Sequence, residues 1–122
     1  LGQADEAAKL ITSVRERNFP NNPGKAVVTG SDLQKTSCYD YGRRDNVKTT
    51  HDNAEIKYGR MLDELGWEFS QEGRRRQDMI RFGVFATRSW FSHDASDKSR
   101  NLYPIPQKEL LTNSNLTQNP GY

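Results

Sequence analysis

The acidic residues Glu64, Glu68 and Glu72 recur every four positions within the stretch ELGWEFSQEGRRRQDMIRFG, residues 64–83. Residues four apart lie on the same face of a helix, so these carboxylates are predicted to form one row. Pairs of carboxylates are the groups that hydrolyse glycosidic bonds, but in glycosidases they flank the scissile bond. Carboxylates on successive turns of one helix point the same way. A glycosidase that uses Glu68 and Glu72 is therefore disfavoured, and the chain is not predicted to be an enzyme.

The basic segment that follows the acidic row gives it a structural role instead. Directly after Gly73 come Arg74, Arg75, Arg76 and, a little later, Arg81. A turn at the glycine would fold these arginines back against the glutamates. We expect an ion-paired motif that fixes the angle between two helices, formed by Glu68, Glu72, Arg75, Asp78 and Arg81.

The charge and composition of the chain exclude several classes of function. Its 122 residues carry 18 basic and 16 acidic side chains, mixed along the sequence, which predicts no nucleic-acid binding. Only 33% of the residues are hydrophobic and the mean hydropathy is -0.97, which is little apolar material for a core. Nucleotide-binding and zinc-protease motifs are missing, and Cys38 has no companion ligands. We therefore expect no cofactor and no metal.

Aromatic residues in irregular segments are the candidates for binding a sugar, because a pyranose ring has apolar faces that pack on aromatic rings. Three such residues stand in polar segments without helical period: Tyr39, Tyr41 and Trp90. The alternative for each is that it anchors a loop by packing. Both interpretations stay open at the level of the sequence.

Helical patterns occupy both ends of the region before the tail. Residues 4–17 place apolar side chains at three- and four-residue spacing, which predicts an amphipathic helix that ends near Asn18. Asp52 and Glu55 have the spacing of a capping box, where a helix begins. The apolar stripe that follows predicts that this helix continues to Gly73.

The remaining segments define the fold class. A shorter helix is predicted over residues 75–82, with a break at Gly83. Residues 21–51 have no sustained period and predict a long surface loop, with one helical turn at 31–35. No strand alternation extends beyond a few positions. The chain is therefore predicted to be all-α with long irregular loops.

The last stretch, LYPIPQKELLTNSNLTQNPGY at residues 102–122, is rich in proline and asparagine. Its prolines favour an extended segment, KELL predicts a short helical turn, and NPGY predicts a turn at the end of the stretch. We expect this C-terminal tail to lie over the helices. Tyr103 and Tyr122 should then be mostly buried.

The order of these motifs resembles the SusD/RagB family of nutrient-binding surface lipoproteins. The motifs are LDELGWEFSQEGRRRQDMIRFGVF, then a Trp and a polar connector, then LYPIP and QNPGY in the tail. The resemblance covers about residues 52–122, and residues 4–17 are similar to the last tetratricopeptide-type helix of the family. Nothing specific to the family stands in residues 21–51.

The resemblance implies the C-terminal part of a tetratricopeptide-like SusD fold. Residues 1–20 would be its last repeat helix, residues 21–51 a loop or insertion, and residues 52–122 the C-terminal helices and extended tail. None of the family's sugar-contacting residues can be carried over to a position of this chain. The motifs that match are those of the scaffold.

The resemblance also implies a function, a partner and a location. Members bind glycans or other nutrients without cleaving them, and work with a SusC-like TonB-dependent transporter of the outer membrane. They lie on the cell surface, held by a lipid on an N-terminal cysteine that this chain does not contain. The alternative is a helical protein-interaction scaffold with no direct sugar contact in this segment.

Overall fold

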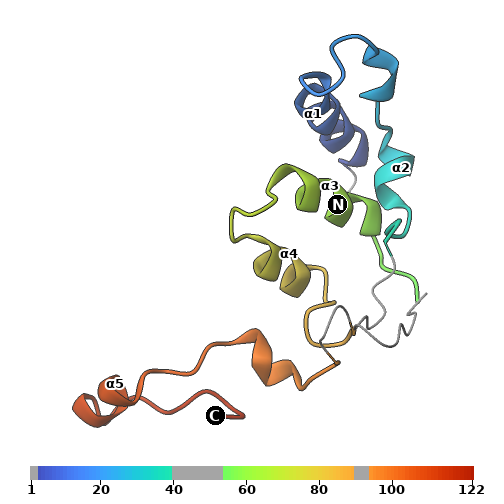
Figure 1. Ribbon diagram of the computed structural model, residues 1–122. Helices are drawn as coiled ribbons and strands as arrows, with labels where there is room; N and C mark the ends of the chain where they lie inside the picture. Colours follow the sequence, from blue (N-terminus) through green and yellow to red (C-terminus); the bar gives the residue numbers. More distant parts are fainter. Residues whose placement is uncertain (1–2, 40–53, 90–93) are drawn as a thin grey trace, which may run out of the picture.

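The structure of the chain, a computed structural model, describes residues 3–39, 54–89 and 94–122 (Figure 1). All regular elements within those ranges are helical, which confirms the all-α fold class. The α-helices are α1 (Ala4–Glu16), α2 (Gly30–Gln34), α3 (Gly59–Glu68), α4 (Arg75–Arg81) and α5 (Gln107–Thr112). Short 3-10 helices are η1 (Pro23–Lys25) and η2 (Lys98–Asn101). None of the described helices is long and apolar enough to cross a lipid bilayer.

The first four α-helices pack on one another in chain order. α1 agrees with the helix predicted over residues 4–17. Thr12 accepts a hydrogen bond from the amide of Val28 at 3.0 Å, and the Arg15 guanidinium donates to the carbonyls of Lys25 and Ala26 at 2.8 and 3.0 Å. These bonds fix the segment that follows α1 against its own helix.

The described part of the segment predicted as a surface loop, residues 21–39, is more ordered and more buried than expected. It contains η1 and α2, and Ala26 and Leu33 are buried. α2 begins with a capping box between Thr29 and Asp32, and its five residues agree with the predicted helical turn. The sequence pattern missed the packing because so short a helix shows no hydrophobic period.

α3 begins at Gly59, and the prediction that it starts at the Asp52–Glu55 capping box is wrong. Glu55 precedes the helix, and Asp52 lies outside the described residues. Tyr58, which caps the helix, has a left-handed backbone with φ of 57°. A Cβ on Gly59 would lie 2.1 Å from the backbone nitrogen of Ser37. A close crossing of two backbone segments therefore sets the start of this helix, and only glycine permits it.

α3 also ends earlier than predicted, at Glu68 instead of Gly73. The turn that follows contains two residues with left-handed backbone, Gln71 at φ 67° and Gly73 at φ 74°. α4 then agrees with the helix predicted over residues 75–82, and Gly83 follows it with φ of 73°. The chain reverses between the two helices, so α3 and α4 pack against each other.

A small apolar core lies between these helices and the segments beside them. Its buried members are Ile56, Leu62, Met79 and Val84. Phe82 and Phe85 pack against its edge. The core is therefore built from the two helices that carry the family-like motif and from the residues that immediately flank them.

The C-terminal tail leaves the helices and folds on itself, shown in orange and red in Figure 1. The Gln118 side chain bonds both the amide and the carbonyl of Ile105, at 2.8 and 3.0 Å, and the Tyr122 hydroxyl donates to the carbonyl of Leu102 at 2.9 Å. Tyr103 is 69% exposed and Tyr122 is 44% exposed. The predicted burial of these tyrosines is therefore wrong, because side-chain bonds to the tail's own backbone shape it. The short helix predicted at KELL is confirmed as α5.

One arginine of α4 joins the tail to the helices. The Arg76 guanidinium lies 4.8 Å from the ring centre of Phe85 and 4.0 Å from that of Tyr103. It also donates to the carbonyls of Arg100 and Asn101 at 2.9 and 3.2 Å. Because Phe85 lies at the edge of the core, this arginine connects the core to the start of the tail.

Candidate functional site

Two ion pairs connect the C-terminal end of α1 to α3; Arg15 lies within α1, and Arg17 is the residue that caps it. Arg15 Nη1 lies 2.8 Å from Glu64 Oε1, with 19% and 5% of the two side chains exposed. Arg17 pairs with Glu68 closer to the surface. The prediction that the acidic row pairs with the arginines after Gly73 is therefore wrong for these two glutamates. A periodic pattern identifies a helix face, but it does not show which distant segment meets that face.

The other residues of the predicted motif have separate roles. Arg75 Nη1 donates to the carbonyl of Leu62 at 2.8 Å, so its guanidinium lies on α3. Arg81 Nη1 lies 3.8 Å from Asp78 Oδ1, an ion pair of the kind predicted. Asp78 is 1% exposed, and its carboxylate accepts no hydrogen bond from the described residues. Glu72 is exposed.

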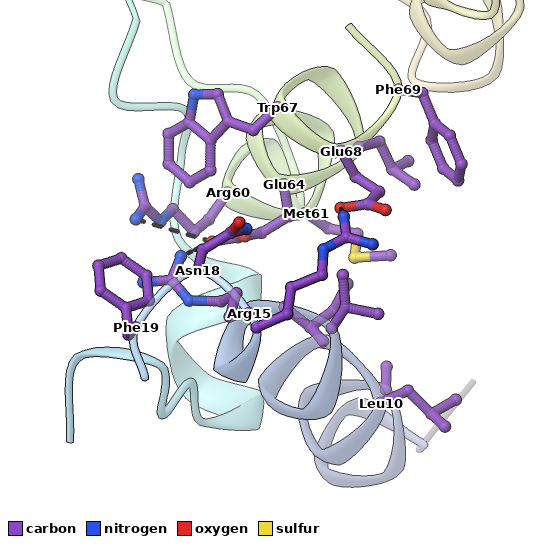
Figure 2. Close-up of a pocket in the computed structure, with 15 residues that line it drawn as sticks. Leu10, Arg15, Asn18, Phe19, Arg60, Met61, Glu64, Trp67, Glu68 and Phe69 are labelled. Atoms are coloured by element: carbon purple, nitrogen blue, oxygen red, sulfur yellow. Dashed lines mark hydrogen bonds and ion pairs between the residues drawn. The ribbon is translucent and has the colours of Figure 1, made fainter. Parts of the chain in front are cut away.

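A groove of about 750 Å³ runs between α1 and α3 (Figure 2). Its apolar lining consists of Ala7, Leu10, Ile11, Val14, Met61, Leu65 and Phe69. Figure 2 shows Arg15 and Arg60 directed toward Glu64, with the rings of Phe19 and Trp67 beside this charged cluster. The groove therefore combines an apolar wall with a compensated group of charges.

Trp67 also lines a second hollow, of about 510 Å³, which we call the aromatic cleft. The cleft is lined by Tyr39, Asp63, Gly66, Trp67, Phe69, Ser70, Gln71, Gly73 and Arg75. The rings of Tyr39 and Trp67 meet at 69° with their centres 6.1 Å apart, and the indole N–H donates to the Tyr39 hydroxyl. Trp67 is 41% exposed and Tyr39 is 51% exposed. Two aromatic walls therefore stand at the surface in a fixed relation.

A buried carboxylate positions these two rings. Asp63 is fully buried and accepts hydrogen bonds from the Ser37 hydroxyl and, at 2.8 Å, from the amide of Cys38. These bonds hold the residues just before Tyr39 on α3. Partial desolvation and then the neighbouring Asp63 carboxylate raise the pKa of the Cys38 thiol, although the residue as a whole is exposed.

The structure places only part of the aromatic set that the sequence proposed. Tyr39 lies in the cleft, whereas Tyr41 and Trp90 lie outside the described residues. Trp67 was not among the candidates, although a signal for it existed. It stands off the apolar stripe of its helix, which includes Leu62 and Leu65, and a large aromatic residue in that position is predicted to be exposed.

The cleft also contains polar side chains and one buried carboxylate. Both oxygens of its carboxylate, on Asp63, already accept hydrogen bonds. The side chains of Ser70 and Gln71 are exposed and polar. Across the residues that the structure describes, His, Cys, Asp and Glu form no group that could hold a metal ion. The cleft therefore offers aromatic faces and neutral hydrogen-bonding groups.

Comparison with known proteins identifies relatives of this chain. The sequence model of the SusD family matches residues 1–122, including residues 21–51, where motifs alone gave no sign of a family. Starch-binding protein SusD of Bacteroides thetaiotaomicron is 40% identical over 70 residues. The aligned part is 51% of this chain but 13% of that protein, so the match spans a small part of the relative's length.

Proposed function

Because this chain belongs to the SusD family, we propose that the protein binds glycans at the cell surface without cleaving them and delivers them to a transporter. One observation carries the proposal: two exposed aromatic rings, Tyr39 and Trp67, are held at a fixed angle as walls of one cleft. Exposed aromatic rings held in place by buried bonds are suited to the apolar faces of sugar rings.

The name of the relative supports the ligand class. That protein is described as starch-binding, and this chain shares 40% identity with it over the aligned residues. The carboxylates of α3 support binding over hydrolysis. Glu64 pairs with Arg15 and Glu68 pairs with Arg17, whereas a glycosidase needs two carboxylates that flank one glycosidic bond.

The location and the partner are further parts of the proposal. The protein acts at the outer membrane, attached by a lipid, and its partner is a SusC-like TonB-dependent transporter that imports the glycan. Family membership supports both statements. The tail supports a contact with another macromolecular surface, because Leu102, Tyr103 and Leu111 are 49%, 69% and 77% exposed.

A second candidate function is a protein-interaction scaffold. The groove between α1 and α3 favours it, because this groove has a mainly apolar wall and Leu10 on that wall is 63% exposed. Such a scaffold would bind a partner protein through the groove and would bind no sugar. Glycan retention by the full-length protein separates the two functions.

The experiment is native affinity electrophoresis of the full-length protein in gels that contain one polysaccharide each, with starch and several unrelated polysaccharides in the panel. We expect at least one polysaccharide to slow the protein, with no new reducing ends after prolonged incubation. Release of reducing ends would contradict the non-catalytic function. Equal mobility in every gel, together with capture of the transporter from membranes, would favour the scaffold.

A further inference from the structure

We propose that the aromatic cleft is a subsite for the pyranose units of a neutral oligosaccharide. This inference rests on the proposed function and assigns part of it to Tyr39 and Trp67. The volume of about 510 Å³ lies within the range of roughly 300–1,000 Å³ that is usual for small-molecule sites. It is therefore large enough for a short stretch of a glycan chain.

The first argument is the arrangement of the two rings. Their planes meet at 69°, so they form two walls of a corner. The C–H face of a pyranose packs against one wall while its edge, which carries hydroxyl groups, remains directed toward polar side chains. Arg60 lies 4.6 Å from the centre of the Trp67 ring and restrains the indole, so the corner is formed before a ligand arrives.

The second argument is the hydrogen-bonding capacity of the cleft. The Tyr39 hydroxyl accepts from the indole N–H, and among the described residues its own proton has no acceptor. A phenol both accepts and donates, so this proton is available to a ligand. The side chains of Ser70 and Gln71 make no hydrogen bond with the described residues. These groups both donate and accept, as sugar hydroxyls do.

The third argument is the backbone of Gln71. This residue lines the cleft with φ of 67°, a left-handed conformation that is uncommon for residues other than glycine. Residues in such conformations gather at ligand sites, where the fold holds them against their preference. The turn between α3 and α4 thus presents an amide side chain to the cleft at some cost in backbone energy.

The charges around the cleft are compensated, which favours a neutral ligand. Arg60 lies 3.8 Å from both Asp63 and Glu64, so its charge already faces two carboxylates. Asp63 also accepts the two hydrogen bonds that hold the segment before Tyr39. The Arg75 guanidinium donates to the carbonyl of Leu62. The charged groups at the cleft therefore already have partners, which favours a neutral sugar over an acidic or basic one.

The test uses the full-length protein and a soluble oligosaccharide made from whichever polysaccharide retards it. The variants are Trp67→Ala, Tyr39→Ala and Tyr39→Phe, with Tyr103→Ala as a control that removes an exposed tyrosine from the tail. Calorimetry gives the Kd. We expect each alanine variant of the cleft to raise the Kd about tenfold, which corresponds to 1.4 kcal/mol, and the control to leave it unchanged. Tyr39→Phe should raise the Kd less, because the ring remains.

A second measurement locates the ligand independently of any change in folding. Amide hydrogen exchange of the wild type should slow on oligosaccharide binding in the peptides that contain residues 37–39 and 66–72. Wild-type binding with unchanged Kd in the cleft variants, or with protection only elsewhere, would overturn this subsite and leave glycan binding intact. Failure of the wild type to bind any glycan would overturn the proposed function, and this inference with it.

Discussion

The two ion pairs between the end of α1 and α3 allow one sharp prediction, because they differ mainly in burial. In the Arg15–Glu64 pair the side chains are 19% and 5% exposed, and in the Arg17–Glu68 pair they are 61% and 27% exposed. The perturbation is Glu64→Gln, with Glu68→Gln as its matched control. Both substitutions keep the shape of the side chain and remove one negative charge.

The expected cost follows from what each glutamate leaves behind. Glu64→Gln removes the negative charge that faces the mostly buried guanidinium of Arg15. It also removes the charge that lies 3.8 Å from the guanidinium of Arg60. Breaking one partner of a buried pair costs roughly 3–5 kcal/mol, and the remaining amide oxygen still accepts a bond, so we expect about 2–4 kcal/mol. Exposed pairs contribute roughly 0–1 kcal/mol, which is the range expected for Glu68→Gln.

The assay is urea unfolding of the chain, followed by far-UV circular dichroism and extrapolated to water. Added salt should reduce the small effect of the exposed pair more than the effect of the buried pair. The reasoning would be refuted if the two variants lost the same stability. A double variant, Arg15→Met with Glu64→Leu, should recover only part of the loss. It leaves no charge stranded within the pair, but it removes the bonds from Arg15 to the carbonyls of Lys25 and Ala26.

Further predictions concern single positions. Gly59→Ala should abolish the native helix content in far-UV spectra, because its Cβ would lie 2.1 Å from a backbone nitrogen; a native spectrum would contradict this. Gln71→Gly should raise the unfolding free energy by up to about 1 kcal/mol, since glycine adopts a φ of 67° freely, and a lower value would argue against strain. Arg76→Ala should speed proteolysis within the tail, because its ring contacts hold the tail, and an unchanged cleavage rate would show that other contacts suffice. The hydrogen bond from Lys35 lowers the pKa of Asp32 below its ordinary value of 3.8. The stability that the Asp32 carboxylate gives to α2 is therefore present above pH 3.8 and is lost as the pH falls through the lowered pKa. Amide exchange in α2 that stays constant on acidification would contradict this prediction.

The elements that the sequence predicted well are those whose pattern is local. α1 and α4 follow from a three- and four-residue period and from Gly83, which carries the positive φ that ends α4. The start of α3 does not follow, because the crossing of Gly59 with Ser37 is a tertiary contact. The spacing of Asp52 and Glu55 is a local signal, and the tertiary contact determines where the helix begins.

The candidate site was predictable only in part, for a related reason. Tyr39 was proposed from its place in a polar segment, and Trp67 was recognisable as an aromatic residue off its helix's apolar stripe. Their meeting depends on Asp63, whose burial and partners no spacing reveals. For the tail, the prediction placed too much of the segment in the interior. Its apolar residues suggested burial, but Gln118 satisfies its backbone from within.

The Arg15–Glu64 contact has a kinetic consequence, because it joins residues 49 positions apart. Arg15 also bonds the carbonyl of Ala26, only 11 positions away. Closing the shorter loop loses less chain entropy, so the junction of α1 with α2 should form early during folding. The groove of Figure 2 forms only when α3 has folded and packed against α1. We therefore expect the groove to form late during folding and to be lost early during unfolding.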